Sequence, residues 1–238
     1  MKIASFLHCS ILVLALHVAA EPDSLQETID ARKAENRAKA PTEKLADYAA
    51  GIEAVAKSGI VETAATVGDV APDFTLTDSN GTAVTLSDEL EKGPVVLTWY
   101  RGGWCPYCNI QLAAYQQILP QIEELGAQLI AVSPELPDKS HSTVEKNQLK
   151  FTVLSDINLK VAEEYGLVFE LTPEVEKHYA NSFSIKEYYG EEASTRELPL
   201  AATYVINPTG KIVWSFLDAD YTKRAEPRDI ISALDAIE

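Results

Sequence analysis

The chain has 238 residues, a length typical of one domain or of one domain with an extension. Its 36 Asp and Glu residues outnumber 20 Lys and Arg residues, and the net charge of −16 argues against a basic surface for nucleic acid or an anionic membrane. Hydrophobic residues make up 46% and charged residues 24%, a globular rather than a disordered composition.

Residues 1–20 have the layout of a secretory signal peptide. Lys2 precedes an apolar stretch over residues 3–18, and small residues end at Ala20. The stretch is short for a transmembrane helix, although an uncleaved anchor stays open as an alternative. We therefore expect cleavage near Ala20 and export to the periplasm or the outside of the cell, with no membrane attachment afterwards.

Residues 21–65 predict a helical extension. One helix carries Leu25 and Ile29 and ends at Pro41; a second begins after Thr42 and has Gly59 near its end. We expect these helices to pack on the main domain or to form a homodimer contact. A partly frayed arm is the alternative that this composition leaves open.

Residues 66–238 predict a single α/β domain. Apolar runs indicate strands at 95–100, 127–133, 151–156, 202–206 and 211–216. Helical patterns follow the Cys motif as far as Pro120 and cover 138–149, 158–166, 173–190 and 227–238. Continuous runs such as VVLTWY are typical of strands buried on both faces, so we expect a mixed central β-sheet flanked by helices.

The chain has three cysteines, and removal of a signal peptide would leave two of them. Cys9 lies in the expected leader, whereas Cys105 and Cys108 form a C-x-x-C pair. A zinc site needs four ligands, and His141 and His178 lack a metal-ligand spacing, so we expect no metal and no organic cofactor. A structural disulfide is the stronger alternative, but a bridge over so short a loop stabilises a fold weakly.

The segment WYRGGWCPYC indicates redox chemistry. A buried strand and a Gly-Gly turn put Cys105 where a helix begins, and free N–H groups there favour a thiolate. Cys108 follows one turn later, within reach of Cys105. The motif predicts a reversible dithiol/disulfide couple, with Trp104 and Tyr107 as a collar on which a substrate or another chain docks.

Three segments resemble one known family. Residues 67–90, 95–108 and 198–213 resemble the alkyl hydroperoxide reductase/thiol-specific antioxidant group, which contains the peroxiredoxins, and most of all its members with R-G-G-W-C-P-x-C. The resemblance implies a thioredoxin-like fold. It also implies a thiol-dependent peroxidase that reduces hydrogen peroxide or organic hydroperoxides with electrons from a thioredoxin-like protein or a small thiol.

The chain departs from the peroxiredoxin motif P-x-x-x-T-x-x-C. In that motif the Cys attacks the peroxide, and it falls on Cys108, while the Thr falls on Cys105 and the Pro on Arg101. The second Arg of the family falls near Ala201, and Gln111 stands where many members have Glu. Our hypothesis is that Arg101 supplies part of the missing positive charge.

The resemblance leaves two roles open for each cysteine. In a peroxiredoxin, Cys108 would form a sulfenic acid that Cys105 resolves to a disulfide. In an exported thioredoxin-like protein thiol–disulfide oxidoreductase, Cys105 would attack and Cys108 would resolve the mixed disulfide. A binding module with a merely structural bridge is the non-enzymatic alternative.

Overall fold

The computed structural model describes residues 24–237. The expected signal peptide, with Cys9, lies outside the described residues. Within residues 24–237, no helix has both the length and the apolar character needed to cross a membrane.

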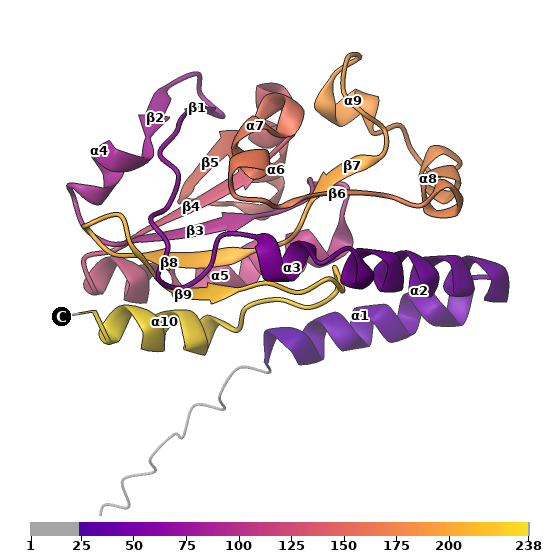
Figure 1. The fold of residues 1–238 in the computed structure, drawn as a ribbon, viewed down its shortest axis with the longest axis horizontal. Helices are drawn as coiled ribbons and strands as arrows, with labels where there is room; N and C mark the ends of the chain where they lie inside the picture. Colours follow the sequence, from indigo (N-terminus) through magenta and orange to yellow (C-terminus); the bar gives the residue numbers. More distant parts are fainter. Residues whose placement is uncertain (1–23, 238) are drawn as a thin grey trace, which may run out of the picture.

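The domain is built on a seven-stranded sheet with the order β2-β1-β5-β4-β3-β8-β9 (Figure 1). Its strands are β1 (Thr75–Asp78), β2 (Ala83–Thr85), β3 (Val95–Trp99), β4 (Gln128–Ser133), β5 (Thr152–Ser155), β8 (Thr203–Ile206) and β9 (Ile212–Phe216). Strand β4 pairs in parallel with β3 and β5, whereas the other pairs are antiparallel. The mixed sheet expected from the sequence is confirmed.

Helices flank the sheet and precede it. They are α1 (Leu25–Lys39), α2 (Thr42–Lys57), α3 (Ile60–Thr63), α4 (Leu86–Leu90), α5 (Pro106–Glu124), α6 (Pro137–Asn147), α7 (Lys160–Glu164), α8 (Pro173–Ala180), α9 (Lys186–Tyr189) and α10 (Pro227–Asp235), with a 3₁₀ turn at Ile157–Leu159. A small second sheet pairs β6 (Val168–Glu170) with β7 (Glu197–Pro199). This pair brackets α8 and α9, so the expected helical insertion is two short helices.

The central strand β3 is buried on both faces, as its apolar run predicts. Because side chains alternate along a strand, Val96 packs in the core that contains α1, α5 and α10. Leu97 and Trp99 pack in the opposite core, with residues of α3, α4 and α7. The sheet thus fixes the end of β3, from which the cysteine motif continues.

Helix α5 does not end at Pro120, so that expectation was wrong. The helix continues to Glu124, although Pro120 lacks the N–H that would bond one turn back. Leu119 and Ile122 are both buried in the same core on either side of the proline. Apolar burial on both sides holds the turn in helical geometry.

The N-terminal helices pack on the domain rather than fraying. Leu25 and Ile29 of α1 are buried in the core shared with α5, and in Figure 1 α1 begins near one end of α10. Helix α2 packs on α8, where the Asp47 Oδ2 lies 2.7 Å from the His178 Nε2. The extension therefore forms part of the folded unit.

Truncating Ile29 to alanine tests this packing. The side chain is fully buried, so Ile29→Ala is expected to lower the free energy of unfolding by about 2–5 kcal/mol. Chemical denaturation measures the change, with Thr28→Ala on the exposed face of α1 as the matched control. If both variants unfold in a single transition and Ile29→Ala is as stable as the control, then α1 is not part of the cooperative unit.

Candidate active site

Close packing around the turn after β3 requires glycine at both of its positions. Gly102 has a φ of 145°, and a Cβ there would lie 2.4 Å from Nε1 of Trp104. A Cβ on Gly103 would lie 2.2 Å from Oγ1 of Thr143. The turn is also tied down by buried Glu135, whose carboxylate accepts the Gly103 N–H at 2.9 Å.

Cys105 caps helix α5 and Cys108 lies in its first turn. The Cys105 Sγ accepts the Cys108 N–H at 3.4 Å, and Pro106 occupies the first helical position, where no N–H is needed. Both cysteines are free thiols and fully buried. The predicted placement of Cys105 at the start of a helix is confirmed.

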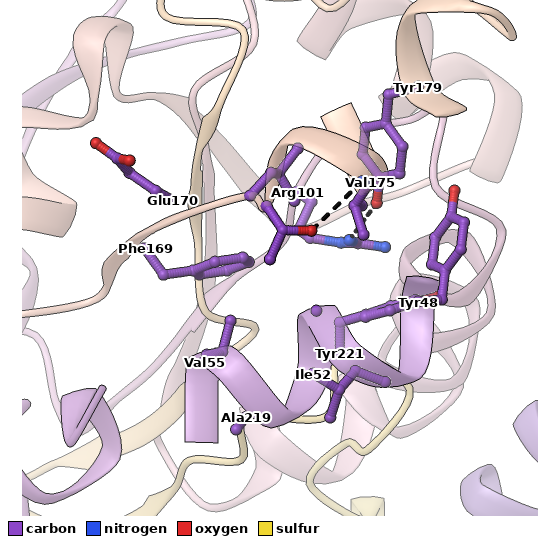
Figure 2. A pocket seen from close by; sticks show the side chains of 13 residues that line it. Tyr48, Ile52, Val55, Arg101, Phe169, Glu170, Val175, Tyr179, Ala219 and Tyr221 are labelled. Carbon is purple, nitrogen blue, oxygen red and sulfur yellow. Dashed lines mark hydrogen bonds between the residues drawn. The ribbon is translucent and has the colours of Figure 1, made fainter. Parts of the chain in front are cut away.

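Arg101 lies next to Cys105. Its Nη2 donates to the Cys105 Sγ at 3.2 Å, and its Nη1 donates to the Tyr179 hydroxyl at 2.8 Å. The guanidinium lies 4.1 Å from the centre of the Tyr221 ring, which favours a cation. Figure 2 shows Arg101 at the wall of a small, largely apolar pocket that Tyr48 also lines. Arg101 is 3% exposed, so its charge acts in a dry environment.

A second arginine, Arg224, lies next to Cys108. Its Nη2 donates to the Cys108 Sγ at 3.5 Å, and its Nε donates to the Gln111 Oε1 at 2.6 Å. The Gln111 amide in turn donates to Thr98 on β3 at 3.0 Å. The family's Arg is absent near Ala201, and Arg101, which we expected to supply part of the missing positive charge, does not act alone. Arg224, from the segment after β9, brings a second buried cation to the sulfurs.

The two sulfurs differ in their acidity. Burial opposes the ionisation of Cys105, but a hydrogen bond from Cys108 and the charges of Arg101 and Arg224 lower its pKa well below the ordinary thiol range. Burial raises the pKa of Cys108, and the neighbouring Cys105 sulfur raises it further. Of the two sulfurs, Cys105 is therefore the more acidic.

The collar of Trp104 and Tyr107 is covered rather than open. Trp104 packs against Phe183 with ring centres 4.8 Å apart, so the insertion between β6 and β7 reaches over the cysteine motif. Tyr107 is buried, and its hydroxyl accepts the Asn36 side-chain N–H of α1 at 3.2 Å. A docking partner therefore meets these two rings only where α1 and the insertion leave them uncovered.

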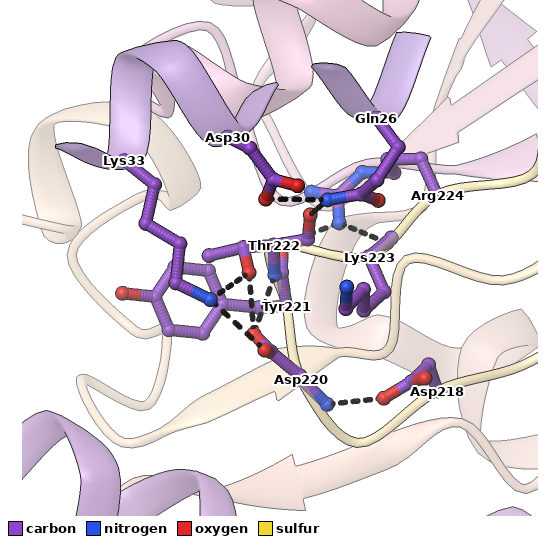
Figure 3. A network of polar contacts seen from close by, with 9 residues as sticks. All are labelled: Gln26, Asp30, Lys33, Asp218, Asp220, Tyr221, Thr222, Lys223 and Arg224. Carbon is purple, nitrogen blue, oxygen red and sulfur yellow. Dashed lines mark hydrogen bonds and ion pairs between the residues drawn. The ribbon is translucent and has the colours of Figure 1, made fainter. Parts of the chain in front are cut away.

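Helix α1 holds the segment that carries Arg224 (Figure 3). Lys33 donates to Asp220 at 3.2 Å and to Thr222 at 2.8 Å. Glu226 accepts the first backbone N–H groups of α1, at 3.0 Å from Leu25 and 2.9 Å from Gln26. The position of Arg224 thus depends on contacts with the N-terminal extension.

Arg224, Glu135 and Tyr179 were not foreseen as site residues. They come from three segments far from the cysteines in sequence, and no local spacing connects them. Arg224 stands in a charged stretch that resembles any exposed loop, and burial of a charge cannot be read from one sequence. Within residues 24–237, no cluster of three or more His, Cys, Asp or Glu side chains is placed to hold a metal ion.

Residues 67–215 match the AhpC/TSA family. This match covers more than half of the chain and includes the whole cysteine motif, so the chain belongs to the AhpC/TSA family. Helices α1 and α2 lie before the matched region.

Curated relatives agree with this assignment, and a solved structure has a similar fold. The chain is 33% identical to peroxiredoxin Q, chloroplastic, from Triticum aestivum over 133 residues, which are 56% of this chain and 61% of that protein. It is 31% identical to peroxiredoxin Bcp from Escherichia coli K12 over 100 residues, 42% of this chain and 64% of that protein. The matched part thus spans less than two thirds of these relatives. The crystal structure of peroxidoxin BcpB from Mycobacterium tuberculosis has a TM-score of 0.57 at 22% identity and covers 73% of this chain and 98% of its own.

The ionisation of Cys105 should depend on both arginines. Because its pKa is lowered, the thiolate is present above that pKa and is lost as pH falls through it. Arg101→Met or Arg224→Met is expected to move this transition upward by about 1–3 pH units. Thiolate ultraviolet absorbance measures it, with Cys105→Ser as the blank for the tyrosines.

The exposed Arg228 provides the matched control, because Arg228→Met removes the same charge from helix α10. A transition that shifts equally in Arg228→Met and Arg101→Met would show that net charge, rather than contact with the sulfurs, sets the acidity of Cys105.

Proposed function

We propose that this protein is a thiol peroxidase, which reduces hydroperoxides through the Cys105–Cys108 pair. The observation that carries the proposal is a buried dithiol flanked by two buried arginines, at 3.2 Å and 3.5 Å from its sulfurs. Membership of the AhpC/TSA family and the similarity to proteins named peroxiredoxins support it.

The reaction oxidises the dithiol by two electrons. A thiolate attacks the nearer peroxide oxygen, the O–O bond breaks, and the alkoxide or hydroxide leaves and takes up a proton. The resulting sulfenic acid is attacked by the second thiol, which forms the disulfide and releases water. The guanidinium groups of Arg101 and Arg224 lie against the two sulfurs, so their positive charge is close to where negative charge develops on the leaving oxygen, and in a dry site such charges are effective.

The proposal assigns the first attack to Cys105. The family motif places the attacking cysteine on Cys108, but the thiolate is the reactive form, and the hydrogen bond from Cys108 together with the charges of Arg101 and Arg224 lowers the pKa of Cys105. Cys108, whose pKa is raised, then serves as the resolving thiol. Arg101 holds and activates the thiolate, while Trp104 and Tyr107 enclose it.

An external thiol completes the cycle by reducing the disulfide. We propose a thioredoxin-like protein or a small thiol in this role, because the pair can re-form its dithiol by exchange. Export after cleavage near Ala20 and a homodimer also stay as proposals, the first resting on residues 1–20 alone.

A second candidate function is protein thiol–disulfide exchange. A cysteine with a lowered pKa at a helix N-cap, followed by a partner three residues later, is the arrangement that exchange requires. The burial of both sulfurs under α1 and α8 favours a small peroxide over a protein substrate.

Stopped-flow oxidation by hydrogen peroxide separates these functions. The reduced protein is expected to consume one peroxide and form one disulfide. In Cys108→Ser, mass spectrometry is expected to find a sulfenic acid on Cys105. Cys105→Ser is expected to react more slowly. The expected loss is about tenfold for each unit by which the pKa of its remaining Cys108 thiol exceeds the pKa of Cys105 in the wild-type protein.

Two outcomes would contradict this assignment. A fast sulfenic acid on Cys108 in Cys105→Ser, with an inert Cys108→Ser protein, would give the first attack to Cys108. If the reduced protein ignores peroxide while Cys105 forms mixed disulfides with a peptide disulfide, exchange is the function.

A further inference from the structure

A cleft of about 570 Å³ lies between the α1–α2 hairpin and the cysteine motif. This volume is in the range of small-molecule sites. Its apolar and aromatic wall includes Leu45, Tyr48, Ile52, Trp104, Phe183 and Tyr221. The hairpin that forms one side lies outside residues 67–215, so the cleft is not formed by the family's domain alone.

The cleft is cationic although the chain carries a net charge of −16. Five basic residues line it and no Asp or Glu does; the five are Lys33, Arg37, Lys39, Lys44 and Arg101. Lys33 is paired with Asp220, and Arg101 bonds to Cys105. Over residues 24–237, no carboxylate forms an ion pair with Arg37, Lys39 or Lys44, so these three side chains are available to an anion.

Two residues of the cleft lining also carry buried donors without a partner within residues 24–237. The Nε of Arg101 and the Nε1 of Trp104 are buried and have no hydrogen-bond partner among the described residues. Both residues line the cleft, and Arg101 is 3% exposed. These two atoms are themselves out of contact with solvent, so recognition of a ligand rests on the three unpaired cations of the cleft rather than on these donors.

These features select one class of ligand. The aromatic wall suits an apolar chain, and the three unpaired cations suit a carboxylate. A zwitterionic peptide thiol fits less well, because its ammonium group would find no carboxylate in the lining. Arg101 lines the cleft and donates to the Cys105 Sγ at 3.2 Å, so one side chain links the inner end of the cleft to the buried thiol.

We propose that the cleft binds apolar hydroperoxides that carry a carboxylate, and that Arg37, Lys39 and Lys44 recognise this carboxylate. The inference rests on the proposed peroxidase function and adds a charge selectivity for which the N-terminal hairpin is responsible. A neutral hydroperoxide of the same length lacks the group that the three cations bind.

A matched substrate pair tests the role of charge. The full-length reduced protein is assayed with linoleic acid hydroperoxide and with its methyl ester, and kcat/KM is expected to favour the acid by about tenfold, as several partly exposed ion pairs allow. In the triple variant Arg37→Gln, Lys39→Gln and Lys44→Gln, the preference is expected to disappear while hydrogen peroxide is reduced at the same rate.

The control variant changes the net charge equally on another surface. Lys146, Lys150 and Lys160 are exposed and do not line the cleft, so their replacement by Gln is expected to keep the preference for the acid. If this variant also loses the preference for the acid, the preference comes from the overall electrostatic field of the protein and the inference is overturned.

Binding is measured separately from turnover. The unreactive hydroxy derivative of linoleate and its methyl ester are titrated calorimetrically against the Cys105→Ser, Cys108→Ser protein, with and without the three cleft substitutions. Carboxylate binding that needs the three cations supports the site even if the wild-type protein does not reduce peroxides, in which case the peroxidase proposal alone fails.

Two results would overturn the inference while leaving the peroxidase intact. In one, hydrogen peroxide is reduced but acid and ester bind and react equally. In the other, the triple variant slows only the recycling of the disulfide by glutathione, which would assign the cleft to an anionic thiol reductant.

Discussion

Two buried arginines without carboxylate partners are the constraint on which this site depends. A charge removed from water is costly unless a counter-charge or several hydrogen bonds compensate for it. Within residues 24–237, neither Arg101 nor Arg224 forms an ion pair with Asp or Glu. Their partners are hydroxyl, amide, carbonyl and sulfur atoms, so ionisation of a thiol supplies the negative charge that the site lacks.

This compensation also affects the redox balance of the pair. The thiolate on Cys105 disappears when the disulfide forms, and the two cations then lose their nearest negative charge. A site that stabilises the reduced thiolate makes its disulfide more oxidising. Such a disulfide is readily reduced by an external thiol, while a hydroperoxide is a strong enough oxidant to regenerate it. The electrostatics therefore suit both halves of the proposed cycle.

The sequence was sufficient for the architecture and for the position of the sulfurs. The run VVLTWY, the Gly-Gly turn and Cys105 at the start of a helix are local patterns, and each is found where expected. Arg224 was missed because it reaches Cys108 across 116 residues, through a segment without periodicity. Helix α5 passes Pro120 because tertiary burial on both sides overrides a local helix-breaking preference.

The departures from the family motif form one connected change. Arginine at position 101 and cysteine at 105 replace a Pro and a Thr, and they meet in the bond between the Arg101 Nη2 and the Cys105 Sγ. The Arg that is missing near Ala201 has its counterpart in Arg224, whose Nε bonds to Gln111, the residue that stands where Glu is common. An amide accepts this bond without a charge, so the cation of Arg224 is not neutralised before it acts on the sulfurs.

Helix α1 belongs to the same change. Lys33 of α1 donates to Asp220 and Thr222, which lie in the segment that carries Arg224. Glu226, at the end of the same segment, accepts backbone N–H groups from the first turn of α1. The family's Arg falls near Ala201, just before strand β8 of the sheet, whereas Arg224 lies in the segment after β9. Moving the cation to a loop requires an element that holds the loop, and the extension before residue 67 provides it. The altered cysteine motif and the N-terminal helices are thus parts of a single solution to placing positive charge at the sulfurs.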